Sequence, residues 1–219
     1  MFRHVPNIIT AARLVLAFVF FGLLSWYQFE GRGSPVVLNI AFIVYAIALF
    51  SDFLDGYLAR KWKVEGAFGR IVDPFVDKVL VLGSFIFFAG KNFVIPDFEM
   101  MKQTEHSAFV VKTITGITPL MVVIILAREL LVTAFRSMGE QSGQAFGAQF
   151  AGKLKMVFQS ITILVILVYV NYFVPYGTNP TVLNYATYVR DFFIWTTILI
   201  TVLSGLSYVR GAIKVARGA

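Results

Sequence analysis

Residues 51–79, SDFLDGYLARKWKVEGAFGRIVDPFVDKV, place four aspartates in a chain that is otherwise mostly apolar. The first two aspartates are spaced i, i+3 and the last two i, i+4, and on a helix either spacing puts both side chains on one face. Small residues follow the same faces. The residues concerned are Asp52, Asp55, Asp73 and Asp77, with Gly56, Ala59 and Gly69 beside them. The stretch therefore predicts two helices, each with a pair of carboxylates next to a strip that has almost no side chain.

Four carboxylates held close together repel one another, and they stay ionised only if cations lie between them. Ligands that are all oxygen suit Mg²⁺ or Mn²⁺ better than zinc. Two such ions are able to bind a phosphoryl group on its attacking and its leaving side. We therefore expect the four aspartates to hold two divalent ions. The alternative is a pair of helix ends with solvated acids, which explains one aspartate better than four on matched faces.

Composition points to a membrane protein. Of the 219 residues, 58% are hydrophobic and the mean hydropathy is +0.77, more apolar surface than a soluble domain of this length needs. The simplest interpretation is one membrane domain over residues 1–219. The absence of cysteine excludes disulfides and thiolate chemistry. We attribute the net charge of +7 to cytoplasmic loops and anionic lipid, and expect no nucleic-acid partner.

The apolar runs predict an all-α protein with six transmembrane helices. The expected spans are about residues 8–27, 36–58, 69–90, 115–136, 151–172 and 191–211. No A-x-A cleavage pattern follows the first run, so we interpret it as an uncleaved span. The polar segment 91–114 is expected to be an extramembrane loop inserted in the domain, and no function is assigned to it.

Six spans put both termini on one side of the membrane. Most of the 19 Lys and Arg residues fall on that side, together with the four aspartates. The positive-inside rule therefore places both termini and the aspartates at the cytoplasmic face of the inner (plasma) membrane.

Pro74 lies between Asp73 and Asp77. Because proline is tolerated in the first turn of a helix but not in its interior, we expect these two aspartates at the start of the third span. There they would face the end of the second span, and the helix N-terminus would favour their negative charge.

Basic residues in the last three spans need an explanation, because a charge near mid-span costs roughly 2.5–3.5 kcal/mol. Glu129 is adjacent to Arg128 but points about 100° away on a helix, so we expect it to be a poor direct partner. Our hypothesis is that several basic residues converge on an anionic acceptor: Arg128, Lys153 and Lys155, with Arg136 or Arg210 in addition. The alternative for these residues, and for Arg13 in the first span, is snorkelling to the interface.

The pattern D-x2-D-G-x2-A-R-x8-G-x3-D-x3-D, from Asp52 to Asp77, resembles the signature of the CDP-alcohol phosphotransferases. Members of this family are integral membrane enzymes that move a substituted phosphoryl group from a CDP-linked donor to an alcohol and release CMP. Other segments resemble the phosphatidylglycerophosphate synthase branch: Pro6, Asn7, Thr10 and Arg13, then ARELLVTAFR at 127–136, Gly152-Lys153-x-Lys155, and SGLSYV at 204–209.

The resemblance implies a reaction and roles for these residues. The donor would be CDP-diacylglycerol and the acceptor sn-glycerol 3-phosphate, giving phosphatidylglycerophosphate and CMP in phospholipid biosynthesis. Asp77 would bind metal and accept the proton of the acceptor hydroxyl, and Arg60 would assist at the diphosphate. The CDP group would lie against Asp52, Asp55, Gly56, Ala59, Arg60, Gly69 and Asp73. The resemblance also implies a homodimer.

Two alternatives remain open at this stage. Within the family, synthesis of phosphatidylinositol phosphate or cardiolipin is the main one. Outside it, a divalent-cation transporter would use the aspartates as an ion path, but they fall at the ends of their spans and not at mid-bilayer, where such sites usually lie.

Overall fold

Six long helices make up most of the structure, a computed structural model that describes residues 5–62, 67–96, 111–141, 150–174 and 179–218. The helices are α1 (Val5–Trp26), α2 (Pro35–Trp62), α3 (Ala67–Phe88), α5 (Pro119–Gln141), α6 (Phe150–Val168) and α7 (Pro180–Gly218). The side chains of some residues within these ranges lie outside the description: 5–7, 53, 55–62, 67–74, 111, 136, 138–141, 150–151, 153 and 210–218.

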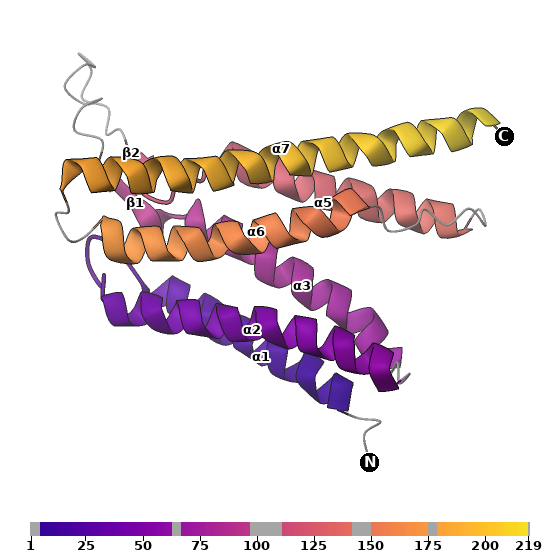
Figure 1. The fold of residues 1–219 in the computed structure, drawn as a ribbon, viewed down its shortest axis with the longest axis horizontal. Coiled ribbons are helices and arrows are strands. Elements are labelled where there is room, and N and C mark those ends of the chain that lie inside the picture. The colour runs from indigo at the N-terminus through magenta and orange to yellow at the C-terminus, as the bar shows by residue number, and fades with distance from the viewer. Residues whose placement is uncertain (1–4, 63–66, 97–110, 142–149, 175–178, 219) are drawn as a thin grey trace.

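The helices run alternately in opposite directions, so that α1 begins and α7 ends at the same end of the bundle (Figure 1). Helix α1 packs against α2 and α3, and α7 packs against α5 and α6. Contacts of α2 with α6, and of α3 with α5 and α6, join these two groups. The bundle therefore brings α3 into contact with both halves of the chain.

Four of the described helices contain a stretch long and apolar enough to cross a membrane: Ile8–Trp26, Pro35–Asp52, Leu154–Phe173 and Pro180–Val209. For α3 and α5, the continuously described side chains, 75–88 and 119–135, make a stretch too short to be judged as a span. The described structure is thus mostly helical, and its four long apolar helices are consistent with the predicted membrane protein. That all six helices cross, and that both termini face the cytoplasm, stays a prediction.

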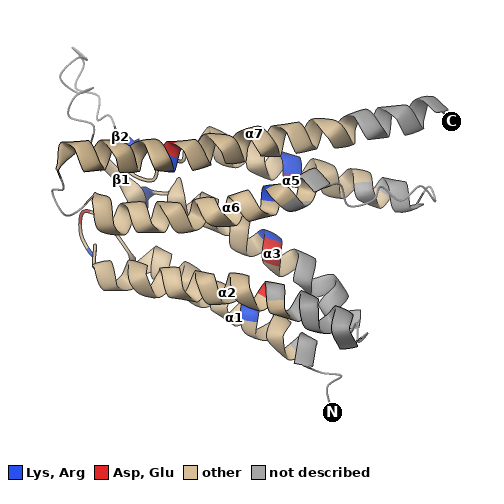
Figure 2. Ribbon diagram, viewed as in Figure 1, with Lys and Arg blue, Asp and Glu red and all other residues tan. Residues whose placement is uncertain are grey.

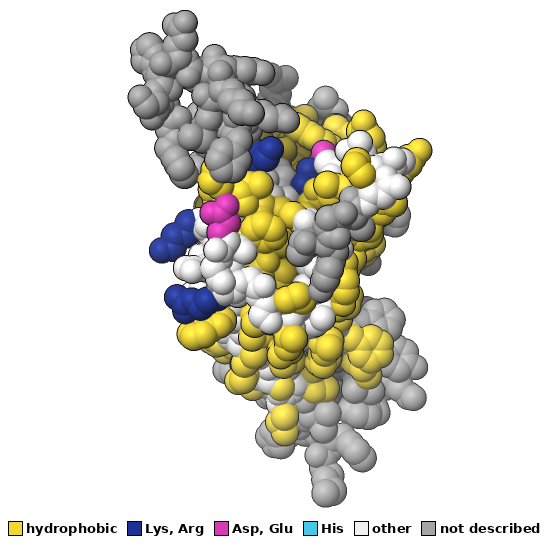
Figure 3. All heavy atoms as spheres, turned by 90° about the vertical axis from the view of Figure 1, so that its left-hand side faces the viewer, with side chains coloured by type: hydrophobic (Ala, Val, Ile, Leu, Met, Phe, Trp, Pro, Cys, Tyr) yellow, Lys and Arg dark blue, Asp and Glu magenta, His cyan; other side chains and the backbone are white. Residues whose placement is uncertain are grey.

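Apolar side chains are found both inside the bundle and on its outside. In the interior, aromatic rings pack among aliphatic side chains: the rings of Phe20 and Tyr45 lie 5.2 Å apart and those of Phe88 and Phe93 5.6 Å apart. On the outside, Phe18 and Trp195 are more than half exposed. Figure 3, which looks at one end of the bundle, shows hydrophobic side chains over much of the described surface. An outer surface of this kind fits lipid better than water.

Helix α7 begins at Pro180, whereas we predicted a span from about residue 191. The prediction of this boundary was wrong. The Oδ1 atom of Asn179 accepts a hydrogen bond from the backbone N–H of Thr181 at 3.1 Å. Asparagine at the N-cap followed by proline at the first helical position is a favoured helix start. The Asn-Pro pair therefore starts the helix earlier than predicted.

The predicted loop 91–114 contains regular structure where it is described. A short 3₁₀ helix, η2 (Lys91–Phe93), leads into β1 (Val94–Pro96), which pairs antiparallel with β2 (Val111–Thr113). Residues 97–110 lie outside the described part. The extramembrane position of this segment stays a prediction.

Arg190 of α7 attaches the hairpin to the bundle. Its Nη1 donates to the carbonyl of Ile114 at 2.7 Å, and its guanidinium lies 4.5 Å from the centre of the Tyr169 ring. Gly116 makes the close approach of the chain to Arg190 feasible, since a Cβ on this residue would lie 3.0 Å from the Arg190 Nε atom.

We expect Gly116→Ala to lower the unfolding midpoint of the purified protein in detergent. Gly116 has a φ of +76°, and this left-handed backbone costs an alanine about 1–2 kcal/mol. Gly22→Ala is a matched control, because a Cβ on Gly22 meets no atom within 4 Å. Its midpoint should stay the same or rise slightly, since alanine favours a helix. Equal midpoints for the two variants would contradict the argument.

Candidate active site

Arg13 of α1 is the residue on which the first part of the site is built. Its side chain is only 1% exposed. Its Nη1 donates to Oδ1 of Asp52 on α2 and lies 3.1 Å from Oδ1 of Asp77 on α3. Snorkelling, the alternative considered for Arg13, is therefore wrong. Because one nitrogen contacts both carboxylates, the later part of α2 and the middle of α3 converge on α1.

Two of the four predicted metal ligands, Asp52 and Asp77, thus lie at one site. Asp55 and Asp73 belong to the same two helices, but their side chains lie outside the described part. Among the described side chains, no group of three or more potential metal ligands occurs. The convergence of α2 and α3 agrees with the prediction, and the complete set of four ligands stays a prediction.

The placement of Pro74 in the first turn of a helix was wrong. Helix α3 begins at Ala67, so Pro74 lies in its interior. A proline there has no N–H to donate to the carbonyl four residues earlier. The aspartates therefore lie well after the start of α3, and the argument that a helix N-terminus favours their charge does not apply.

A second group of charges surrounds Glu129 of α5. Its Oε1 atom accepts from Nη1 of Arg128 at 2.8 Å and also from Nζ of Lys155 on α6. All three side chains are buried, at most 9% exposed. Arg128 and Lys155 thus converge on the Glu129 carboxylate, and their convergence on an anionic acceptor stays a prediction.

The expectation that Glu129 is a poor partner for Arg128 was wrong. The 100° between neighbouring side chains separates their Cβ directions, but the arginine side chain is long enough to turn its guanidinium back toward the glutamate. Lys155 approaches Glu129 from the neighbouring helix. One carboxylate therefore compensates two cations that would otherwise be buried unpaired.

Arg128 also contacts two residues of helix α7. The Nε atom of Arg128 donates to Oγ of Ser204 at 3.0 Å, and the guanidinium lies 6.0 Å from the centre of the Tyr208 ring. A Cβ on Gly205 would come within 3.1 Å of Arg128 Cγ, so the small residue allows this packing. The segment at 204–209 that resembles the synthase branch thus contacts the basic cluster.

Lys78 connects the two groups of charges. It follows Asp77 on α3, and its Nζ donates to Oγ1 of Thr133 at 2.7 Å, while Thr133 donates to the carbonyl of Glu129. Figure 2 shows charged residues of α1, α2, α3, α5 and α6 in one band across the bundle. The carboxylates and the buried cations are therefore neighbours within one polar layer.

The remaining predicted site residues belong to the expected helices, but nothing is described of their side chains: Gly56, Ala59 and Arg60 on α2, Gly69 on α3, Arg136 on α5, Lys153 on α6 and Arg210 on α7.

Sequence reasoning assigned no role to Lys78 and Thr133. The sequence carried a partial signal for Lys78, since a residue next to Asp77 points about 100° away from it on a helix. Thr133 had no such signal, because its role depends on how α3 and α5 pack.

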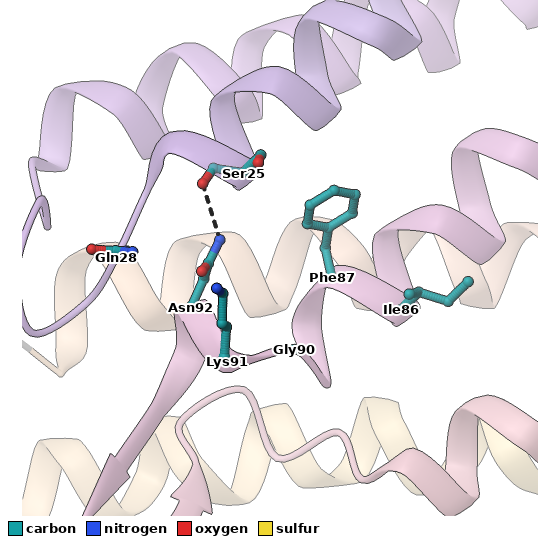
Figure 4. A pocket seen from close by; sticks show the side chains of 7 residues that line it. All are labelled: Ser25, Gln28, Ile86, Phe87, Gly90, Lys91 and Asn92. Carbon is teal, nitrogen blue, oxygen red and sulfur yellow. Dashed lines mark hydrogen bonds between the residues drawn. The ribbon is translucent and has the colours of Figure 1, made fainter.

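A cavity of about 350 Å³ lies elsewhere in the fold and is not this site. It is lined by the end of α1, the end of α3 and η2 (Figure 4): Ser25, Gln28, Ile86, Phe87, Gly90, Lys91 and Asn92. The side-chain amide of Asn92 donates to the carbonyls of Leu24 and Ser25. The Asn92 amide therefore holds the hairpin against α1, and we assign no chemistry to this cavity.

The described carboxylates fit a divalent cation. Asp52 and Asp77 present oxygen atoms to one buried positive charge, and hard cations such as Mg²⁺ and Mn²⁺ prefer oxygen ligands. The position is partly open, with the Asp52 side chain 35% exposed.

A family model described as CDP-alcohol phosphatidyltransferase matches residues 3–203. The chain belongs to this family. The matched segment includes Arg13, the aspartates and the buried cluster around Glu129, so the polar layer lies within the family domain. The resemblance inferred from the signature is confirmed.

Relatives within the family are similar over most of their length. A protein of Bacillus subtilis (strain 168) is 27% identical, over 94% of this chain and 93% of its own. One of Rickettsia bellii is 24% identical over 97% of each chain, and one of Escherichia coli (strain K12) is 26% identical over 80% and 82%. Each is named CDP-diacylglycerol--glycerol-3-phosphate 3-phosphatidyltransferase.

We expect Arg13→Ala to lower the unfolding midpoint, because it leaves the Asp52 and Asp77 carboxylates side by side without their shared donor. Hydrogen bonds to charged groups are worth about 1.5–3 kcal/mol. Mn²⁺ should raise the midpoint of the variant more than that of the wild type, since a cation can replace the missing charge. Arg32→Ala is the control, as this arginine is exposed and lies over the Trp26 ring at the other end of α1. An Arg13→Ala midpoint equal to wild type would show that the contact contributes nothing.

Proposed function

We propose that the chain transfers the phosphatidyl group of CDP-diacylglycerol to sn-glycerol 3-phosphate and releases CMP. The observation that carries the proposal is the position of two adjacent residues of α3. Asp77 contacts Arg13 beside Asp52, and Lys78 donates to Thr133, which donates to the carbonyl of Glu129. A site for a donor diphosphate and a site for an acceptor phosphate would then adjoin each other. The names of the relatives support this reaction.

The donor site would be formed by α2 and α3. Asp52, Asp55, Asp73 and Asp77 would hold two divalent ions, Mg²⁺ or Mn²⁺, which supply charge neutralisation at the diphosphate. The small residues Gly56, Ala59 and Gly69 would leave room for the nucleotide against the backbone, and Arg60 would contact the diphosphate.

The acceptor site would be formed by the buried cations. Arg128 and Lys155 would bind the acceptor phosphate, and Lys153, Arg136 and Arg210 are further candidates. Asp77 and Lys78, which are adjacent on α3, would then place the acceptor hydroxyl between the donor site and the acceptor site. Holding both substrates in one layer supplies proximity, which is a large part of catalysis in transfer reactions.

Asp77 would act as the general base. It would accept the proton of the acceptor hydroxyl while the hydroxyl oxygen bonds to the phosphorus of the phosphatidyl group. The bond from this phosphorus to the oxygen of CMP would break, and CMP would leave. Arg13, which contacts Asp77, would hold its carboxylate in place.

The membrane context is part of the proposal. Apolar helices on either side of the polar layer would keep the lipid chains in the bilayer while the head groups react at its edge. Following the charge distribution, the site would face the cytoplasm from the inner membrane. We propose a homodimer as the functional unit.

The direct test supplies the purified protein with CDP-diacylglycerol, Mg²⁺ and a panel of acceptors, and measures CMP release. We expect release with glycerol 3-phosphate and none with inositol phosphate or phosphatidylglycerol. Release with either of these in place of glycerol 3-phosphate would overturn the proposed acceptor.

Asp77→Asn should abolish turnover and leave CDP-diacylglycerol binding measurable, because the amide keeps the shape but cannot accept the proton. Turnover and donor binding are measured on the same preparation. Asp191→Asn, which changes an aspartate at the other end of the bundle, serves as the control and should keep wild-type turnover. Full activity of Asp77→Asn would remove this residue from the role of base.

A further inference from the structure

The carboxylate of Glu129 occupies a position in the basic cluster that an acceptor phosphate would also need. It accepts hydrogen bonds from Arg128 and Lys155, the two described cations to which the proposed function assigns the acceptor phosphate. The three side chains are buried together, where a charge without a partner is costly. In this structure, the internal carboxylate is therefore the counter-ion of both cations.

The backbone around Glu129 is fixed by contacts that do not involve its carboxylate. Its carbonyl accepts from Thr133 at 2.7 Å, and Thr133 in turn accepts from Lys78 of α3. Arg128 is held independently by Ser204 of α7. Because the two ends of the cluster are held in this way, the Glu129 side chain can change its pairing without moving α5.

The cations keep donors for a second anion. In the contacts of the described residues, Arg128 uses Nε for Ser204 and Nη1 for Glu129, which leaves Nη2. Lys155 uses its ammonium for Glu129 only, and an ammonium has three N–H donors. Arg128 and Lys155 are two cations on one carboxylate, and Lys78 lies nearby through Thr133, so the group has a net positive charge that suits a phosphate.

We propose that Glu129 is a positioning residue of the acceptor site, whose carboxylate holds Arg128 and Lys155 together in the free protein and gives up part of this pairing to the incoming phosphate. This inference rests on the proposed function. It implies that Glu129 lowers phosphate affinity, because its contacts with the cations must weaken when phosphate binds. It also implies that the carboxylate helps product release by forming its hydrogen bonds with Arg128 and Lys155 again.

The test compares Glu129→Gln with the wild type, using inorganic phosphate as the probe. Glutamine keeps the size of the side chain but removes the competing charge. We expect the unfolding midpoint of Glu129→Gln without phosphate to fall, because two buried cations lose their counter-ion. The phosphate concentration that gives half of the maximal rise in midpoint should fall about tenfold. A role in folding alone would lower the midpoint and leave this concentration unchanged.

Enzyme kinetics supply the second measurement. In Glu129→Gln, the KM for glycerol 3-phosphate and the inhibition constant of inorganic phosphate should both fall, while the KM for CDP-diacylglycerol stays the same. Glu129→Asp keeps the charge on a shorter side chain and should give values between those of Glu129→Gln and the wild type. This second variant keeps the test decisive if Glu129→Gln does not fold.

Asp191→Asn is a matched control. Asp191 pairs with the preceding Arg190 at 2.7 Å, as Glu129 pairs with Arg128, but at the opposite end of the bundle. This substitution should change neither the phosphate concentration that gives half of the maximal rise in midpoint nor the inhibition constant of inorganic phosphate.

Equal or weaker phosphate binding in both Glu129 variants would overturn the role of Glu129. Failure of the proposed function has a different signature, since the wild type itself would then release no CMP with glycerol 3-phosphate. The midpoint measurement does not depend on turnover, so the two failures are distinguishable.

Discussion

The structure depends on the burial of one charged group, the guanidinium of Arg13, between two carboxylates inside an apolar bundle. A buried arginine without partners would cost several kcal/mol. Asp52 and Asp77 supply the compensation, and they come from helices that are otherwise free to pack in many ways through apolar contacts. The ion pairs therefore fix where α2 and α3 meet α1. They also bring together two residues of the family signature.

Adjacent positions on α3 then define the layout of the site. Asp77 and Lys78 point about 100° apart on the helix, so one faces α1 while the other reaches Thr133 of α5. This geometry places the carboxylates of Asp52 and Asp77, in the first half of the chain, near the buried cations of the second half. The proposed transfer between two phosphate-bearing substrates needs such an arrangement, with one proposed site for each substrate and the proposed base between them.

The sequence predicted the parts of this account that depend on spacing along one helix. It predicted the six helical segments and the placement of Asp52 on the second helix and Asp77 on the third. It did not predict contacts that depend on side-chain length or on packing between helices. Glu129 was dismissed on its Cβ direction although Arg128 can reach back to it, and Pro74 was placed at a helix start although α3 tolerates it inside. The start of α7 was a missed local signal, since Asn179 and Pro180 form a recognisable cap.

The central claim, that Asp52 and Asp77 belong to one cation site, is tested most directly by Mn²⁺ binding to the purified chain followed by electron paramagnetic resonance. Asp52→Asn and Asp77→Asn are each compared with the wild type, and Asp191→Asn reports the effect of a distant charge. If the two carboxylates share a site, either substitution alone weakens Mn²⁺ binding by at least about tenfold, and Asp191→Asn does not. Wild-type Mn²⁺ affinity in both Asp52→Asn and Asp77→Asn would contradict the account.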